Sequence, residues 1–158
     1  MNMNLIKLKK EYSTHMPMLI KYVQLTKGDV LEIGSGLFST PLLHWLCRDK
    51  KLLTYENNDE YYNFAKKFRW RKHKIIKINN WNEIKIDRHW GVVFIDHAPI
   101  LQRVKDVIKF KDNADYIIIH DSNERCYGYD KIYSYFKYRY DYKDCIPNTT
   151  VLSNFKPL

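Results

Sequence analysis

Short apolar segments of this sequence repeatedly end in polar or charged residues, and those ends are where chemistry could be done. Five such ends lie at residues 32–36, 56–57, 79–81, 96–97 and 120–123. If the segments are strands of an open α/β sheet, their carboxyl ends share the edge where such sheets bind ligands. A sheet with a purely structural role has no need of polar residues at every end. We therefore expect a ligand site at this edge.

The first of these ends, EIGSG at residues 32–36, combines a carboxylate with two of the chain's five glycines. Glycine permits a sharp turn and a close approach of a ligand to the backbone. The turn is not the dinucleotide fingerprint GxGxxG, because Ser39 stands where the third glycine would be. A tight strand–helix turn alone would explain the glycines. Glu32 places a carboxylate against the bound molecule, which disfavours a pyrophosphate and favours a positively charged ligand.

A second acidic residue, Glu56, ends the next apolar segment, twenty residues after Gly36. An acid at this spacing accepts hydrogen bonds from ribose hydroxyls. Taken alone, Glu56 is equally compatible with a glutamate in a surface loop. Together with the turn at 32–36, it favours a ligand that contains adenosine.

The elements that must position these residues alternate along the chain. Strands are predicted where short β-branched or aromatic runs are apolar on successive residues, at 30–34, 51–56, 74–79, 91–96 and 115–120. Helices are predicted from the spacing of apolar residues at 16–25, 40–49, 59–69 and 99–111. A short helix and two further strands follow, and tyrosines alternate in residues 135–142 as in a strand with one covered face. We predict an α/β, Rossmann-like fold: a mostly parallel seven-stranded sheet with a C-terminal antiparallel hairpin and helices on both faces.

The order and spacing of these segments resemble the class I S-adenosylmethionine-dependent methyltransferases. VLEIGSG resembles their first motif, LLTYEN their ribose-binding motif, INNWNEI their adenine-side motif and VVFIDHAP their fourth motif. The resemblance covers roughly residues 14–155. It implies the methyltransferase fold, S-adenosylmethionine as cofactor, and an enzyme that moves a methyl group to an acceptor.

The resemblance also implies which residues hold the cofactor. Glu32 and the backbone of residues 34–36 would hold the methionine part, Glu56 the ribose, and Asn80 with Trp81 the adenine. The segment around His15 would cap the cofactor from the N-terminal side. The full set of predicted cofactor-binding residues is His15, Glu32, Gly34, Ser35, Gly36, Ser39, Glu56, Asn57, Asn80, Trp81, Asp96 and His97.

The sulfonium of S-adenosylmethionine carries an activated methyl group, so the protein aligns the acceptor and, for some acceptors, removes its proton. His97 and His120 follow strands that end at the expected site, and histidine titrates near neutral pH, as such a base should. His120 could equally cap a strand, and Arg103 could hold an anionic substrate or pair with an acid. We take Asp96, His97 and Asp121 as the catalytic candidates.

The segment FIDHAP followed by IIIHDSN is similar to catechol O-methyltransferases, in which an Asp after the fourth strand and an Asp-Asn pair after the fifth bind magnesium. Asp96 and Asp121 would match the aspartates, but Ser122 stands where the asparagine is expected and Asn123 comes one place late. Two oxygen ligands and water could still hold the ion. Magnesium is therefore an alternative, and no metal-binding residues are assigned. The three widely spaced cysteines form no metal knuckle.

The residues after the fourth strand bear on the acceptor. The sequence DHAP at 96–99 does not match the Asp/Asn-Pro-Pro-Tyr/Phe motif of enzymes that methylate exocyclic amines of nucleic acids. The double-glutamate loop of protein arginine methyltransferases is also missing. We expect the acceptor to be an oxygen of a small molecule, with RNA ribose second. The alternatives are a non-catalytic or RNA-associated binding module and an NAD-dependent oxidoreductase, against which Ser39 and Glu32 argue.

The chain has 158 residues and 45% hydrophobic residues, enough for one minimal domain, with an N-terminal cap and helix (1–27) and a core (28–158). It shows no membrane-spanning run and no signal peptide, which predicts a cytoplasmic protein without membrane contact. Its charge of +9 gathers partly in KKFRWRKHKIIK, residues 66–77. That pattern is typical of a nucleic-acid-contacting edge, and equally of a solvated helix end. Little of the chain is left for a substrate lid, so a homodimer that shares one is a further expectation.

Overall fold

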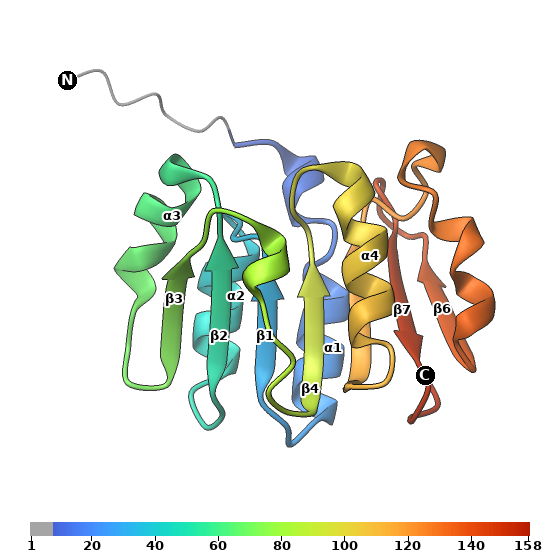
Figure 1. Ribbon diagram of the computed structural model, residues 1–158, viewed down its shortest axis with the longest axis horizontal. Coiled ribbons are helices and arrows are strands. Elements are labelled where there is room, and N and C mark those ends of the chain that lie inside the picture. Colours follow the sequence, from blue (N-terminus) through green and yellow to red (C-terminus); the bar gives the residue numbers. More distant parts are fainter. Residues whose placement is uncertain (1–7) are drawn as a thin grey trace.

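Seven strands form one sheet in the computed structural model, which describes residues 8–158 (Figure 1). The strands are β1 (Val30–Ile33), β2 (Leu52–Glu56), β3 (His73–Lys77), β4 (Trp90–Ile95), β5 (Ala114–His120), β6 (Tyr138–Tyr142) and β7 (Thr149–Ser153). The α-helices are α1 (Met16–Leu25), α2 (Ser39–Leu46), α3 (Asp59–Ala65) and α4 (Ile100–Phe110). Short 3₁₀ segments are η1 (Lys10–Ser13), η2 (Lys66–Phe68), η3 (Trp81–Glu83), η4 (Arg125–Tyr127), η5 (Tyr129–Lys131) and η6 (Tyr133–Tyr135).

The strand order is β3-β2-β1-β4-β5-β7-β6, with β7 antiparallel to both of its neighbours and the other pairs parallel. The predicted mostly parallel sheet with an antiparallel C-terminal hairpin is confirmed. Of the predicted N-terminal segment 1–27, residues 1–7 lie outside the described residues. None of the helices described in residues 8–158 has the length and apolar character needed to cross a membrane.

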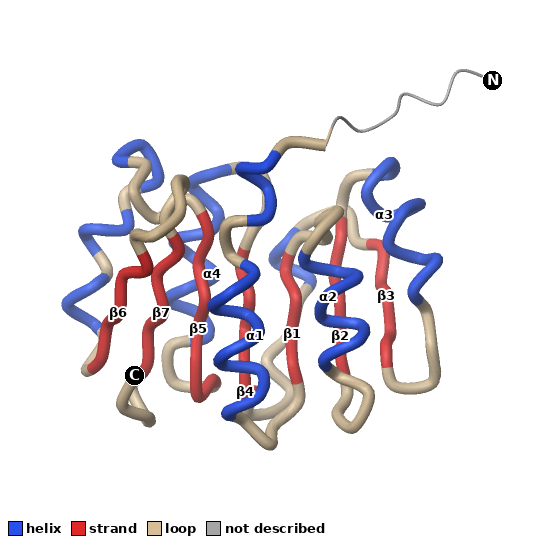
Figure 2. The backbone as a smooth tube through the Cα atoms, turned by 180° about the vertical axis from the view of Figure 1, so that it is seen from behind, coloured by secondary structure: helices blue, strands red, loops and turns tan. Residues whose placement is uncertain are grey.

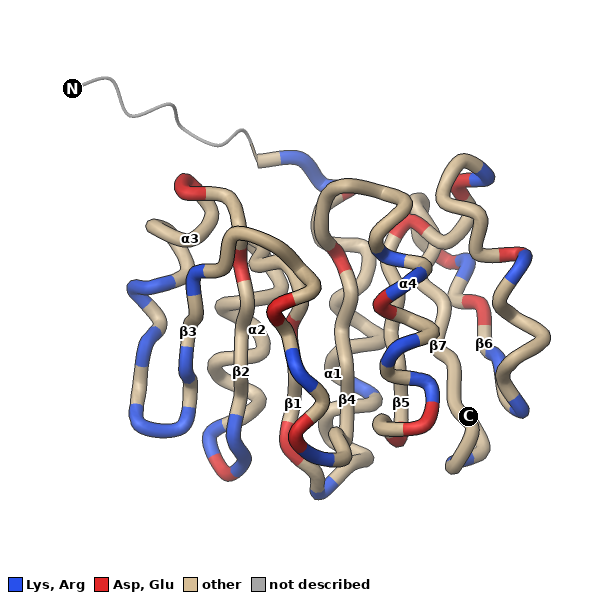
Figure 3. The backbone as a smooth tube through the Cα atoms, in the orientation of Figure 1, with Lys and Arg blue, Asp and Glu red and all other residues tan. Residues whose placement is uncertain are grey.

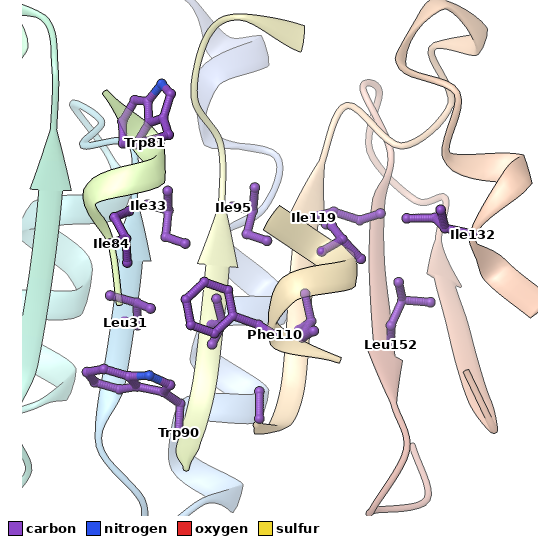
Figure 4. Packing of buried hydrophobic residues seen from close by; sticks show 14 of the residues in the cluster. Leu31, Ile33, Trp81, Ile84, Trp90, Ile95, Phe110, Ile119, Ile132 and Leu152 are labelled. Atoms are coloured by element: carbon purple, nitrogen blue, oxygen red, sulfur yellow. The ribbon is translucent and has the colours of Figure 1, made fainter. Parts of the chain in front are cut away.

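The continuous apolar runs arise because the parallel strands are buried on both faces. Successive side chains of a strand point to opposite faces, so Leu31 packs with Phe110 of α4 on one face (Figure 4). Its neighbour Val30 packs on the other face in a cluster with Leu19 of α1 and Leu43 of α2. The view from behind shows α1 and α2 lying along this second face (Figure 2). The central strands are therefore covered on both faces.

Two predicted helices are shorter than their sequence pattern suggests. The helix predicted at 59–69 ends at Ala65 and continues as the 3₁₀ segment η2, and the helix predicted at 40–49 ends at Leu46. The short helix predicted after residue 128 is a series of 3₁₀ turns, η5 and η6. The apolar spacing identified the elements, whereas the hydrogen-bond pattern of their last turns sets their ends.

The tyrosine-rich strand β6 differs from its prediction. One face of residues 135–142 was expected to be covered, but Tyr138 is 39% exposed and Tyr140 is 41% exposed. Both side chains belong to the same face, because they are two residues apart. The physical reason is the position of β6 at the edge of the sheet, where only β7 pairs with it.

The connection between β3 and β4 contains only the 3₁₀ segment η3, with no α-helix. On this face α4 covers the region of β4 and β5 (Figure 1). The side chains of β2 and β3 that point to this face are consequently less buried than those on the other face. Leu53 and Ile76 are half-buried and Lys74 is exposed, whereas Leu52 and Ile75 are buried.

Candidate functional site

A cavity of about 270 Å³ lies at the carboxyl ends of β1, β2 and β4. It brings together the following predicted residues: His15, Ser35, Gly36, Glu56, Asn57, Asp96 and His97. It also contains residues that the sequence did not single out: Tyr12, Leu37, Asn58, Tyr61 and Ala98. The cavity is where Rossmann-like sheets bind their ligands, beside the first strand.

Gly34 begins the turn that forms one wall of the cavity, and its position admits no side chain. Its φ of 91° lies in the left-handed region. A Cβ atom at this position would stand 2.4 Å from the backbone oxygen of Asp96. The turn after β1 therefore packs directly on the end of β4, which brings two of the predicted strand ends together.

Glu56, at the end of β2, ties two strand ends together through its buried carboxylate. Its Oε2 accepts hydrogen bonds from the backbone N–H of Ser35 (2.8 Å) and from the Ser35 hydroxyl (3.0 Å). Its Oε1 accepts hydrogen bonds from the backbone N–H groups of Asn57 (2.8 Å) and Asn58 (2.7 Å). A carboxylate offers about four acceptor positions, so these bonds use all of them.

Glu32 differs from the expectation that its carboxylate would lie against the bound molecule. It is fully buried beneath the turn and accepts hydrogen bonds from the hydroxyls of Thr40 (3.0 Å) and Thr54 (2.7 Å). Burial raises the pKa of Glu32 to about 7, although hydrogen bonds from hydroxyl groups act in the opposite direction. Glu32 therefore supports the turn from below and does not line the cavity.

His15, from the N-terminal segment, is buried at the cavity and leaves both ring nitrogens without a hydrogen-bond partner among the described residues. The centroid of its ring lies 4.8 Å from the ring centroids of Phe94 and of His120. Burial and the nearby charge of His120 lower the pKa of His15 to about 3. The imidazole is therefore neutral at physiological pH and retains both donor and acceptor capacity for a ligand.

Asp96 lies in a network of charged groups. Arg103 of α4 forms an ion pair with Asp96 Oδ1 (2.9 Å) and donates a hydrogen bond to Asp121 Oδ2 (3.1 Å), so the guanidinium bridges the two aspartates. On its other oxygen, Asp96 contacts His120 Nδ1 at 3.2 Å. Burial raises the pKa of Asp96, but its hydrogen bond to His120 and the charges of His120 and Arg103 outweigh this and hold it well below the usual range.

His120 has both ring nitrogens occupied. Nδ1 faces Asp96, and Nε2 lies 2.8 Å from the hydroxyl of Thr14 in the N-terminal segment. Burial lowers the pKa of His120, but the hydrogen bond to Asp96 and the charges of Asp96 and Asp121 raise it above the usual value of histidine. His120 therefore tends to keep its proton and holds the N-terminal segment against the sheet.

His97 is arranged differently. Its Nε2 contacts the buried carboxylate of Asp106 at 2.9 Å, and its ring is stacked on that of Trp81 with 4.2 Å between centroids. Its Nδ1 has no hydrogen-bond partner among the described residues. Because the carboxylate accepts a hydrogen bond from the Nε2–H group, Nδ1 is left as the acceptor nitrogen of the ring.

Four predicted site residues, besides Glu32, lie outside the cavity. Asn80 accepts a hydrogen bond from the Asn82 backbone at the start of η3, and Trp81 is buried with its indole N–H donating to the Ala98 carbonyl (2.7 Å). Ser39 is the first residue of α2 and is buried. Gly34 contributes backbone alone.

The catalytic candidate Asp121 also lies outside the cavity, where it accepts hydrogen bonds from Arg103 (3.1 Å) and from the Tyr127 hydroxyl (3.2 Å). Its backbone has a φ of 56°, in the left-handed region. That conformation costs about 1 kcal/mol for a residue with a side chain and concentrates at functional sites. Asp121 therefore positions Arg103.

The residues that resemble the magnesium ligands of catechol O-methyltransferases do not fit the ion in this arrangement. The Arg103 guanidinium lies between Asp96 and Asp121 and pairs with both carboxylates, so it takes the place that the ion would need. Ligand atoms of His15, Asp96 and His120 do lie within 4.8 Å of one another. However, Asp96 and His120 are engaged with each other, which leaves the His15 ring as the free group of the three.

The aromatic residues of the cavity were missed because their signals are weak in the sequence. Tyr61 lies in the first turn of α3, whose N-terminal end faces the same edge as Glu56, and Tyr12 belongs to η1. Tyr61 follows Glu56 by five residues, in a helix that begins shortly after this acidic strand end. That spacing could have been used to predict Tyr61 as a site residue. Nothing in the residues around Tyr12 distinguishes it.

The sequence matches no protein-family model and no curated protein. Solved structures do match. The N-terminal domain of human METTL16, in complex with SAH, has a TM-score of 0.67 at 14% identity, covering 96% of this chain and 73% of that one. A proposed O-methyltransferase from Klebsiella pneumoniae has a TM-score of 0.68 at 12% identity, covering 96% and 83%. A proposed caffeoyl-CoA O-methyltransferase from Staphylococcus aureus reaches 0.71 at 15% identity, covering 93% and 84%.

The chain has the class I methyltransferase fold. The resemblance found in the sequence motifs is thus matched by solved structures of this class over nearly the whole chain.

Gly34→Ala is expected to destabilise the protein by about 3 kcal/mol, because the left-handed backbone and the contact with the Asp96 carbonyl both penalise a Cβ. The matched control is Gly128→Ala. Gly128 also has a left-handed φ, of 72°, but nothing lies within 4 Å of its added Cβ, so the expected loss is about 1 kcal/mol. Urea-induced unfolding measures both. Equal losses in the two variants would show that the β1 turn does not pack on β4 as described.

Glu32→Gln is expected to change how stability depends on pH. Burial raises the pKa of Glu32 from 4.5 to about 7, so between these values the folded state keeps a proton that the unfolded state has released. Native stability therefore falls as the pH rises through this window, by roughly 3 kcal/mol. The glutamine variant lacks this loss, so its unfolding free energy relative to the unaltered chain should rise from about pH 4.5 to pH 8. The exposed Glu60→Gln is the control, and a pH-independent offset for Glu32→Gln would contradict the assignment.

Proposed function

We propose that the chain is an S-adenosylmethionine-dependent methyltransferase that transfers the methyl group to an oxygen of a small molecule. The observation that carries the proposal is the Glu56 carboxylate, which lies in the cavity beside the glycine turn after β1. This pairing of an acid with a glycine turn suits an adenosine ligand. The fold supports the same assignment.

The residues in the cavity suit the parts of the cofactor. Glu56 would accept the ribose hydroxyls, and since its acceptor positions are full, the bond from the Ser35 hydroxyl is the one that a ribose hydroxyl can replace. Backbone N–H bonds to the other carboxylate oxygen would persist. Tyr61 offers an aromatic face at the same side of the cavity, and His15 supplies free ring nitrogens on the N-terminal side.

S-adenosylmethionine, when bound, supplies a methyl group already activated on a positively charged sulfur. Asp96 remains ionised at any physiological pH, because the charges of His120 and Arg103 hold its pKa low. It therefore presents a fixed negative charge to a cationic ligand in the cavity. Glu32, with a pKa of about 7, does not serve this purpose.

A hydroxyl acceptor loses its proton during the transfer, and His97 is the group suited to take it. Asp106 holds the His97 ring through Nε2, and Nδ1 is unpartnered. His120 is less suited, because both of its nitrogens are occupied and its pKa is raised. The other predicted catalytic residue, Asp121, acts through Arg103 as a positioning residue.

Matching structures support more than one class of acceptor. The proteins from Klebsiella pneumoniae and Staphylococcus aureus are proposed O-methyltransferases, which favours an oxygen. Another matching structure contains the human METTL16 catalytic domain with an RNA hairpin, at a TM-score of 0.66. RNA is therefore the second acceptor class to test.

Glu56→Gln is expected to weaken binding of S-adenosylhomocysteine by about tenfold or more, because the amide replaces one acceptor oxygen by a donor that faces backbone N–H groups. Isothermal titration calorimetry measures the affinity, with NAD as the comparison ligand. The control is Glu60→Gln, which changes an exposed glutamate of the neighbouring helix α3 and should bind as the unaltered chain does. Failure of the folded, unaltered chain to bind S-adenosylhomocysteine would refute the proposed function, and preferential binding of NAD would favour the oxidoreductase.

His97→Asn is expected to lower the rate of methyl transfer to a hydroxyl acceptor by about 10² to 10⁴. Formation of S-adenosylhomocysteine in the presence of sugars, phenols or RNA measures this rate. The rates of the unaltered enzyme and of the variant are compared at several pH values. The control is His89→Asn, since His89 pairs with Asp115 on the surface. An unchanged rate and pH profile in His97→Asn would remove His97 from the mechanism.

A further inference from the structure

A second cavity, of about 400 Å³, lies at the amino ends of β2, β3 and β4. It is at the opposite end of the strands from the candidate cofactor site. It exists because the connection from β3 to β4 carries no α-helix, which leaves this face of β2 and β3 open. We call this cavity the amino-end groove.

The amino-end groove is lined mainly by cationic side chains: Lys51, Arg71, Lys72, Lys74 and Arg88. Leu53 and Trp90 add apolar surface. Three of the cations come from the basic segment 66–77 noted in the sequence, and the other two come from distant parts of the chain. The fold therefore extends a local run of charge into a three-dimensional cluster.

Most of these cations are not neutralised within the molecule. Arg88 pairs with Asp29 (3.2 Å) and Asp87 (2.8 Å), and the ammonium of Lys72 donates to a backbone carbonyl. In the part of the chain that the structure describes, Lys51, Arg71 and Lys74 form no ion pair. Several unpaired like charges in one groove repel one another, so an anion that spans them would be bound favourably.

We propose that the amino-end groove binds the phosphodiester backbone of a nucleic-acid strand. The groove offers several cations in a row, which suits a polyanion of regular spacing better than a single small anion. Lys and Arg residues also continue along β3 and the loops at the lower ends of β2 and β3 (Figure 3). A second copy of this chain is a poor occupant, because its net charge of +9 would be repelled.

Exposed aromatic side chains lie near the basic segment 66–77, toward α2 and outside the lining of the amino-end groove. Trp70 directly precedes Arg71 and is 37% exposed, with the Arg48 guanidinium 3.8 Å from its ring centroid. Trp45, whose ring lies 5.4 Å from the same guanidinium, is 66% exposed. Arginine and tryptophan faces of this kind stack on the bases of single strands. RNA and DNA share the phosphodiester chemistry, and the experiment separates them.

This inference goes beyond the proposed function and does not depend on it. Lys51 directly precedes β2 and Glu56 is its last residue. The extended chain between these two residues spans about 17 Å. A nucleic-acid strand bound in the amino-end groove would therefore leave the cofactor cavity free. The groove would recruit nucleic acid whether or not the acceptor is RNA.

The test is fluorescence anisotropy with labelled single strands of about 16 nucleotides, one of RNA and one of DNA, and with a labelled polyglutamate peptide. The double variant Arg71→Glu/Lys74→Glu should weaken strand binding by at least about tenfold at low salt. It should also reduce the slope of log affinity against log salt by about 1.4, because two phosphate contacts are lost. The strand that binds more tightly shows whether the groove prefers RNA or DNA.

The matched control is Lys105→Glu/Lys131→Glu, which changes two exposed lysines outside the groove by the same total charge. It should weaken binding by less than about threefold. Three results would each overturn the proposal. They are equal weakening in both double variants, no binding of either nucleic-acid strand, and polyglutamate binding that is as strong as strand binding and equally weakened by the Arg71/Lys74 substitutions. If the charge-reversed variant fails to fold, the neutral double variant Arg71→Gln/Lys74→Gln replaces it. This variant should also weaken strand binding, by a smaller factor. Unchanged binding of S-adenosylhomocysteine separates this result from the proposed function.

Discussion

Four hydrogen bonds to one carboxylate, that of Glu56, fix the two strand ends that frame the cavity. Oε2 holds the turn after β1 through Ser35, and Oε1 holds the first residues after β2. Without this carboxylate, three backbone N–H groups would lose their acceptor near the sheet edge, at a cost of about 1–3 kcal/mol for each that stays buried. The same group that organises the site is thus the one suited to ribose. Structure and binding depend on a single side chain.

Three carboxylates at the site, of Glu32, Asp96 and Asp106, have different surroundings. Glu32 is held by neutral hydroxyls, and its pKa rises to about 7. Asp96 is held by Arg103 and His120, and its pKa falls. Asp106 is paired with His97. Buried charges persist when they are paired and hydrogen-bonded, so the network around Asp96 is the part of the site that carries fixed charge toward a ligand.

Much of the fold and part of the site could be predicted from the sequence. Continuous apolar runs indicated buried parallel strands, and the spacing of Gly36 and Glu56 located the cavity. Which side chains enter the cavity could not be read from strand ends. Trp81 packs in the core with its indole N–H on the Ala98 carbonyl, and Glu32 lies beneath the turn, where Thr40 of α2 donates to it. Arg103 bridges two aspartates only because α4 brings it beside both strand ends. The amino-end groove likewise depends on the missing helix between β3 and β4.

The most direct test of the central claim is a crystal structure of the protein with S-adenosylhomocysteine. The account predicts that the ribose hydroxyls bond to the Glu56 carboxylate and that the Ser35 hydroxyl gives up its bond to Oε2, while Asn57 and Asn58 keep theirs. The ligand would lie between Asp96 and Tyr61. A ligand bound elsewhere on the sheet, or one in the cavity that leaves all four bonds to Glu56 intact, would contradict it.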